Sequence, residues 1–160
     1  MRKTPTFVGV FLYGKKSSKN PMFFPPISRR LQGKRYEKNM KTVLASRPGA
    51  IQASLRATLG SFPQIKLSGW ASGGLSALFK VREDHPDLLV IDGALSEVEV
   101  IHLLTEAKRE DSQLRCIVLV DTAREAQRLL SAGADMALMR DDLSGLLLEA
   151  MREMGLVDTP

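Results

Sequence analysis

The chain has 160 residues, of which 44% are hydrophobic and 26% are charged, and this length and composition are typical of one globular domain. A single cysteine and two histidines exclude an internal disulfide framework and a zinc site with several cysteine ligands. The apolar runs are far shorter than the ~18–20 residues that a membrane-spanning helix requires, so the sequence predicts no membrane span.

The formal net charge of +5 is concentrated at the N-terminus. Residues 1–39 hold ten lysines and arginines against one acid, Glu37, and therefore carry +9, which leaves −4 for residues 40–160. We expect residues 1–39 to be a disordered extension or an artefact of start-site choice, because the pattern of a folded domain begins at Met40. Two other interpretations stay open. One is a signal peptide, although basic residues stand where small ones are needed for cleavage. The other is a basic arm that binds nucleic acid or an anionic membrane.

From residue 40 onward, short apolar runs alternate with segments of helical periodicity. The apolar runs predict five strands, at residues 42–45, 65–70, 88–91, 116–120 and 136–139. Cys116, at the start of the fourth run, is predicted to be a core residue. The helical segments after each strand gather their apolar residues on one face, as follows: Ile51, Leu55 and Leu59; Leu75, Leu78 and Phe79; Val98, Ile101, Leu104 and Ala107; Ala123, Ala126, Leu129 and Leu130; Leu143, Leu146, Leu147, Ala150, Met151 and Met154.

Five strands that are each followed by a helix, with continuous apolar runs in the central strands, favour an open parallel sheet with helices on both faces. In such sheets, functional residues lie beyond the carboxyl ends of the strands. The residues predicted at these ends form the candidate site, and they are Ser46, Arg47, Asp92, Val120 and Arg140.

Four segments resemble the receiver domain of two-component response regulators. They are Leu55-Arg56-Ala57, GWASGG at 69–74, PDLLVID at 86–92 and AGAD at 132–135. The resemblance extends from Met40 to about Met154 and rests on the order and spacing of these segments. It implies a flavodoxin-like (CheY-like) α/β fold, a three-layer sandwich whose five parallel strands have the order 2-1-3-4-5. We accordingly expect a receiver-like domain over residues 40–156, followed by a tail at 157–160.

The resemblance also implies a pocket for phosphoryl transfer. In the family, an acid pair after the first strand helps to hold Mg²⁺, and an aspartate that ends the third strand accepts the phosphoryl group. A hydroxyl and a lysine that end the fourth and fifth strands bind that group, and an aromatic residue on the fifth strand acts as a switch. At the corresponding positions this sequence has Ser46 and Arg47, Asp92, Val120, Arg140 and, at the switch, Ala137.

Of these positions, the acceptor Asp92 keeps the residue type of the family. We therefore expect the pocket not to bind Mg²⁺ usefully and the protein to have no cofactor. Because arginine suits bidentate pairing with a carboxylate, we predict a permanent ion pair of Asp92 with Arg47 or Arg140 that fixes the domain in one state. The alternatives are an Asp92 carboxylate satisfied by neighbouring amides, and phosphorylation of Asp92 with the help of Mg²⁺.

These features favour a stand-alone, non-enzymatic module in the cytoplasm, acting in two-component or phosphorelay signalling through phosphorylation-independent protein–protein interaction. We expect a protein partner, a histidine kinase or another regulator. We also expect a homodimer through the fourth helix, fifth strand and fifth helix, a face that includes Arg124, Glu125 and Arg128. The domain itself is not expected to bind nucleic acid. Two alternatives stay open: a functional receiver phosphorylated at Asp92 by a histidine kinase, and a basic arm that tethers the domain to nucleic acid or a membrane.

Overall fold

The computed structural model describes residues 40–154, apart from the side chain of Asp142. The predicted extension at 1–39 and the predicted tail at 157–160 lie outside these residues, so the domain limits stay predictions. Strands and helices alternate along the described chain. The elements are, in order, β1 (Met40–Ala45), α3 (Ala50–Gly60), β2 (Ile65–Ala71), α4 (Gly74–Asp84), β3 (Leu88–Asp92), α5 (Glu97–Glu110), β4 (Arg115–Val120), α6 (Ala123–Ser131), β5 (Met136–Met139), the 3-10 helix η1 (Arg140–Asp142) and α7 (Leu143–Glu153).

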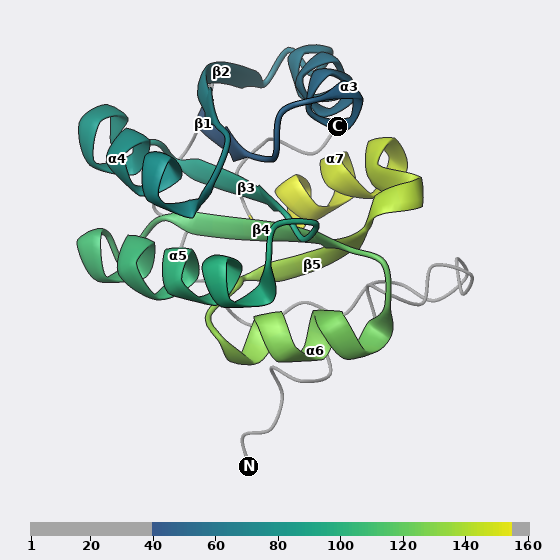
Figure 1. Cartoon of the computed structure of the whole chain (residues 1–160). Coiled ribbons are helices and arrows are strands. Elements are labelled where there is room, and N and C mark those ends of the chain that lie inside the picture. The colour runs from purple at the N-terminus through teal and green to yellow at the C-terminus, as the bar shows by residue number, and fades with distance from the viewer. Residues whose placement is uncertain (1–39, 155–160) are drawn as a thin grey trace.

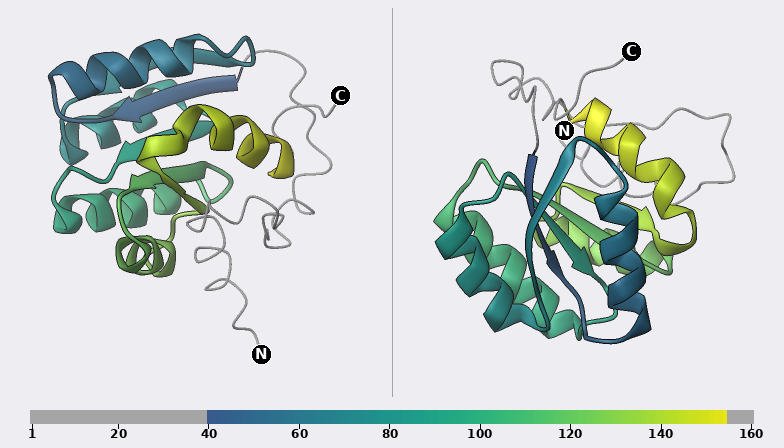
Figure 2. Two further views of the ribbon diagram at one scale, coloured as in Figure 1. Left: turned by 90° about the vertical axis from the view of Figure 1, so that its right-hand side faces the viewer. Right: turned by 90° about the horizontal axis from the view of Figure 1, so that it is seen from above.

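The five strands form one parallel sheet with the order β2-β1-β3-β4-β5. This order confirms the predicted fold. Helices α3 and α7 cover one face of the sheet, and α4, α5 and α6 cover the other (Figure 1, Figure 2). Because each strand is followed by a helix that returns along the sheet, the carboxyl ends of all five strands share one edge. We call it the carboxyl edge and the opposite one the amino edge.

The central strands are enclosed on both sides by two apolar layers. All residues of β3 and β4 are buried, as the continuous apolar runs predicted. The side chains of β3 alternate between the layers: Leu88 and Val90 pack toward α3 and α7, whereas Leu89 and Ile91 pack toward α4, α5 and α6. This double burial fixes the register of the strand, and with it the position of Asp92 at its end.

In α3, α4 and α5, some residues that were predicted to face the core are at least half exposed. They are Ile51, Leu75, Phe79 and Val98. In α4 the small residues Gly74 and Ala77 are buried instead. A Cβ atom on Gly74 would lie 2.9 Å from Cγ of Glu99 in α5. The two helices therefore approach closely at Gly74, while Leu75 and Phe79 face outward.

Cys116 lies fully buried in β4, which confirms the core position predicted for it. Burial, together with the charge of nearby Asp135, raises the pKa of its thiol to about 12. In the unfolded chain this thiol has its ordinary pKa of 9.0. The neutral buried thiol therefore stabilises the fold in full below that pH, and the stabilisation is lost as the pH rises toward the folded pKa.

We expect alkaline pH to destabilise the wild-type chain more than Cys116→Ala. Between about pH 7 and about pH 10 the extra loss in the free energy of unfolding is about 1.4 kcal/mol, because only the unfolded wild-type chain gains a thiolate in this range. Urea unfolding of both chains at the two pH values measures it. Equal pH dependence in the two chains would contradict the prediction. In addition, the native thiol should react with a disulfide reagent only as fast as the chain unfolds.

Candidate functional site

The carboxyl edge brings together residues that lie far apart in the sequence. Ser46 follows β1, Asp92 ends β3, Val120 ends β4 and Arg140 follows β5. Since β1, β3, β4 and β5 are successive neighbours in the sheet, their ends lie about one strand spacing apart. The sequence-predicted positions therefore meet at one site.

Asp92 is 1% exposed, and both of its carboxylate oxygens are engaged. Oδ2 accepts a hydrogen bond of 3.2 Å from the hydroxyl of Ser46. Oδ1 accepts a hydrogen bond of 3.0 Å from the backbone N–H of Ala94 and also forms an ion pair with Nη1 of Arg140. A buried carboxylate is stable when it is paired and hydrogen-bonded, and these three donors meet that need.

Arg140 joins two carboxylates. Its Nη1 contacts Asp92, while its Nε and Nη2 lie 3.0 and 3.5 Å from the two carboxylate oxygens of Asp121. The Arg140 side chain is 20% exposed and that of Asp121 is 66% exposed. Burial alone lowers the pKa of the Arg140 guanidinium, but the hydrogen bonds and charges of Asp121 and Asp92 outweigh burial and raise this pKa above its ordinary value. Arg140 is thus a permanent cation beside the buried acid.

Of the two partners predicted for Asp92, the structure places Arg140 in contact with it, and Arg47 lies elsewhere. Its side chain is 58% exposed, and its Nη2 lies 3.9 Å from Oε1 of Glu99 in α5. The hydroxyl of Ser46 lies next to Asp92. The side chain of the next residue, Arg47, therefore points away from the site. Glu99 also accepts a hydrogen bond of 2.8 Å from the backbone N–H of Gly74 at the N-terminus of α4. Arg47 therefore belongs to the contact between α4 and α5.

Val120 and Ala137 are fully buried. They place methyl groups where the resemblance implies a hydroxyl and an aromatic ring. The hydroxyl of Thr122, two residues beyond Val120, is used elsewhere: it accepts a hydrogen bond of 3.1 Å from the backbone N–H of Glu125 and caps the N-terminus of α6. Val120 and Ala137 therefore supply only apolar surface to the site.

Two features of the site were not foreseen from the sequence: the Asp121 contact with Arg140 and the close packing at Gly93. The contact from the Ala94 amide belongs to the alternative in which neighbouring amides satisfy the Asp92 carboxylate. The backbone N–H of Gly93 donates to the carbonyl oxygen of Leu119 at 2.8 Å, and a Cβ atom on Gly93 would lie 2.4 Å from that oxygen. The loop after Asp92 thus crosses close to β4. Asp121 directly follows β4, and this position at a strand end is the signal that could have identified it.

No family model matches the chain. Over 105 residues the chain is 22% identical to the response regulator protein VraR of Staphylococcus epidermidis, a match that covers 64% of this chain and 50% of VraR. Over 94 residues it is 30% identical to a protein-glutamate methylesterase/protein-glutamine glutaminase of Methanospirillum hungatei, which covers 56% of this chain and 28% of that protein. The chain thus spans half or less of the length of these curated relatives.

Solved structures of receiver domains have the same fold. The signal receiver domain of the putative response regulator NarL from Mycobacterium tuberculosis matches with a TM-score of 0.61 at 16% identity, covering 72% of this chain and 98% of that domain. The response regulator domain of Thermotoga maritima CheB matches with a TM-score of 0.58 at 21% identity, covering 76% of this chain and all of that domain. These matches consistently indicate a response-regulator receiver domain over residues 40–154. Asp92 ends β3, the position at which the resemblance to this family implies the phosphoryl acceptor.

The residues of this receiver domain do not fit Mg²⁺ at the acceptor position. Mg²⁺ demands near-octahedral ligation by oxygen atoms. Here the acid-pair positions hold a hydroxyl and a cation, Ser46 and Arg47, and the Asp92 oxygens are engaged by Ser46, Ala94 and Arg140. Between residues 40 and 154, no three His, Cys, Asp or Glu side chains gather as a metal site requires. The Asp92 charge is compensated by the donors of the protein itself.

The methylesterase match covers 28% of that protein and lies in its receiver domain, so the match does not carry the activity of the whole relative over to this chain. Receiver domains are in general not enzymes. No helix in the described part of the chain is long and apolar enough to cross a membrane.

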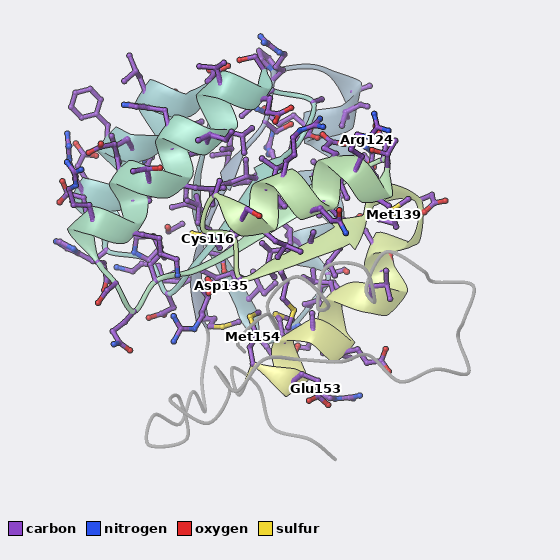
Figure 3. The ribbon with its side chains drawn as sticks, turned by 90° about the horizontal axis from the view of Figure 1, so that it is seen from below. Cys116, Arg124, Asp135, Met139, Glu153 and Met154 are labelled. Carbon is purple, nitrogen blue, oxygen red and sulfur yellow. The ribbon has the colours of Figure 1, made fainter. Side chains whose placement is uncertain are left out.

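The face of α6, β5 and α7 was predicted as an interaction surface. Figure 3 views the molecule from this side and labels Arg124 on α6 and Glu153 on α7. Arg128 of α6 is directed toward α5, where its Nε lies 2.7 Å from a carboxylate oxygen of Glu97. Glu125 accepts a hydrogen bond of 3.1 Å from the backbone of the loop between β4 and α6. Two of the three charged side chains predicted for this face therefore serve contacts within the domain.

Proposed function

We propose that this receiver domain acts in two-component signalling as a protein-interaction module whose state does not depend on phosphorylation of Asp92. The observation that supports the proposal is the ion pair of Arg140 with the nearly fully buried Asp92 carboxylate. A receiver accepts a phosphoryl group through this carboxylate, and here its charge is neutralised by a fixed cation. Arg140 thereby takes the place of the metal and the lysine of the family.

Phosphorylation of Asp92 would require several changes at once. One carboxylate oxygen would have to leave its donors and reach solvent from a position that is 1% exposed. The charge that develops on the phosphoryl group is normally stabilised by preorganised donors and cations, and Val120 offers only methyl groups in that place. Each of these changes raises the barrier to phosphorylation of Asp92, so the acceptor position is better suited to a structural role.

We propose that a protein partner, a histidine kinase or another regulator, binds the face of α6, β5 and α7, and that a second copy of the chain is the alternative occupant. As a signalling module of this kind the protein would act in the cytoplasm. The charge of −4 on residues 40–160 gives the domain itself no general attraction for nucleic acid. The output activities of VraR and the methylesterase are not part of the proposal, because the chain spans half or less of each.

Intact-mass measurement of the full chain after incubation with Mg²⁺ and acetyl phosphate tests the proposal. We expect no phosphoryl adduct above the level found for Asp92→Asn, while a conventional receiver domain treated in the same way becomes modified. An adduct on the wild-type chain that is absent from Asp92→Asn would contradict the proposal and make the protein a working phosphoacceptor.

A further inference from the structure

Two exposed aromatic side chains line a groove at the outer strand of the sheet. Trp70 of β2 is 44% exposed and Phe79 of α4 is 62% exposed, and both line a groove of about 470 Å³. This volume lies in the range of ligand-binding pockets. The lining comes from the start of α3, the end of β2 and α4, and β2 is the outermost strand, at the end of the sheet opposite β5 (Figure 1). The groove is therefore separate from the face of α6, β5 and α7.

Each of the two rings has a cation beside it. The guanidinium carbon of Arg56 in α3 lies 3.8 Å from the centre of the Trp70 ring, the geometry of a cation–π contact. Lys80, the neighbour of Phe79 in α4, also lines the groove. None of the described side chains that line it is acidic, and between residues 40 and 154 no carboxylate forms an ion pair with Arg56. The groove is thus both aromatic and basic.

The ammonium group of Lys80 is only weakly paired within the domain. Its Nζ lies 3.8 Å from Oδ2 of Asp84, one turn later in α4, and its side chain is 34% exposed. A Cβ atom on Gly69 would lie 2.7 Å from Cε of Lys80, so the lysine stem crosses β2 at a residue that has no side chain. Because partly exposed ion pairs contribute little, the Lys80 ammonium is able to bind a carboxylate from outside the domain.

The end of β2 also offers unpaired backbone groups. The carbonyl oxygen of Ala71 accepts a hydrogen bond of 3.0 Å from the backbone N–H of Ser46, the residue after β1, so the backbone groups of Ala71 point toward β1. Neighbouring residues of a strand direct these groups to opposite sides. The N–H and carbonyl groups of Trp70 therefore point to the free side of β2, where an edge strand can accept a further strand.

We propose that this groove binds an extended, acidic peptide segment of a partner protein, and that the segment pairs with the free side of β2. The side chains of an added strand alternate between the two faces of the sheet. One face offers Trp70 with Arg56, and the other offers Phe79 with Lys80. A segment that carries acidic and apolar side chains on both of its faces therefore matches the groove. This surface goes beyond the proposed function, and its role does not depend on the state of Asp92.

Two other occupants fit the groove less well. A second copy of the chain, paired edge to edge, would bring the cations of the groove against the same cations, and like charges across a strand pair are destabilising. A single-stranded nucleic acid could stack on the two rings and pair its phosphates with the cations. Its sugar-phosphate backbone, however, has no N–H groups to match the carbonyl of Trp70. A peptide satisfies the rings, the cations and the strand edge together.

Titration of the full chain with a capped peptide of repeated Glu-Glu-Val-Val tests the proposal. Trp70 is the single tryptophan of the chain, so its emission reports on the groove and not on the basic residues 1–39. We expect the emission to shift to shorter wavelength as the peptide covers the indole, and a Gln-Gln-Val-Val peptide to bind at least tenfold more weakly. Lys80→Gln should weaken binding about fivefold. The matched control Lys66→Gln, which removes an exposed cation of β2 outside the groove, should leave the affinity unchanged.

Hydrogen exchange of the Trp70 backbone amide tests the pairing with β2. We expect the Glu-Glu-Val-Val peptide to slow this exchange at least tenfold, since the N–H then donates to the peptide. An unchanged emission, an equal loss of affinity in Lys66→Gln and Lys80→Gln, or an unchanged exchange rate would overturn the proposal. An oligothymidylate that shifts the emission at lower concentration than the peptide would point to nucleic acid, and a shift with protein concentration alone would point to a second copy. Either result would also overturn it.

Discussion

Replacing Arg140 with methionine lowers the free energy of unfolding by about 3 kcal/mol, because it leaves a buried carboxylate without its cation. Asp92 is 1% exposed and would keep only the Ser46 hydroxyl and the Ala94 amide as donors. Methionine preserves much of the packing of the arginine stem, so the loss of stability comes mainly from removal of the charge. Urea unfolding of the full chain measures the effect.

The matched variant Asp92→Asn should cost less, about 1 kcal/mol. In that variant Arg140 keeps its ion pair with Asp121, which is 66% exposed, and is therefore not left without an anion. The double variant Asp92→Asn/Arg140→Met should lose less free energy of unfolding than the two single variants lose together, because neither charge then remains. If Arg140→Met were as stable as the wild type, the ion pair would not stabilise the fold.

Replacing Gly93 with alanine is the second change with a large expected effect, a loss of about 3 kcal/mol. The added Cβ would lie 2.4 Å from the carbonyl oxygen of Leu119 and 2.9 Å from Oε2 of Glu125. The first of these atoms belongs to the backbone of β4, which is held in the sheet on both sides and cannot move aside cheaply. The loop that positions the Ala94 amide over Asp92 would have to shift.

The matched control is Gly60→Ala at the end of α3, where nothing lies within 4 Å of an added Cβ. Alanine is favoured over glycine in a helix, so this variant should gain about 0.5 kcal/mol. Thermal and urea unfolding of the two variants side by side measures the contrast. A Gly93→Ala chain that keeps wild-type stability would show that the loop after Asp92 is not closely packed on β4.

The sheet could be predicted from the sequence because its central strands are buried on both faces. A short, continuous apolar run between two helical segments, such as Leu88–Ile91, is typical of a strand in the middle of a parallel sheet. The helix faces were less predictable. In α4 the apolar Leu75 and Phe79 outweigh Gly74 and Ala77 in any hydrophobic pattern, yet the small residues are buried because α4 and α5 approach closely.

The candidate site was predictable in its positions and not in its contacts. The rule of strand ends places Ser46, Asp92 and Arg140 at one edge, and the structure brings these three side chains together. The sequence could not decide between Arg47 and Arg140, because the direction of a side chain after a strand depends on its loop. Nor does any sequence pattern pair Asp121 with Arg140, a contact that arises from the spacing of β4 and β5.

The backbone amide of Ala94 offers the most direct test of a closed acceptor site, because it donates to Oδ1 of Asp92, the oxygen that Arg140 also contacts. Amide NMR spectra of the full chain are recorded before and after addition of Mg²⁺, and then of beryllofluoride as a phosphoryl mimic. We expect neither addition to move the Ala94 resonance, in the wild-type chain or in the Asp92→Asn control. A shift of the Ala94 resonance that requires both Mg²⁺ and beryllofluoride, and is absent from Asp92→Asn, would contradict this expectation and show that the Asp92 carboxylate is free to react.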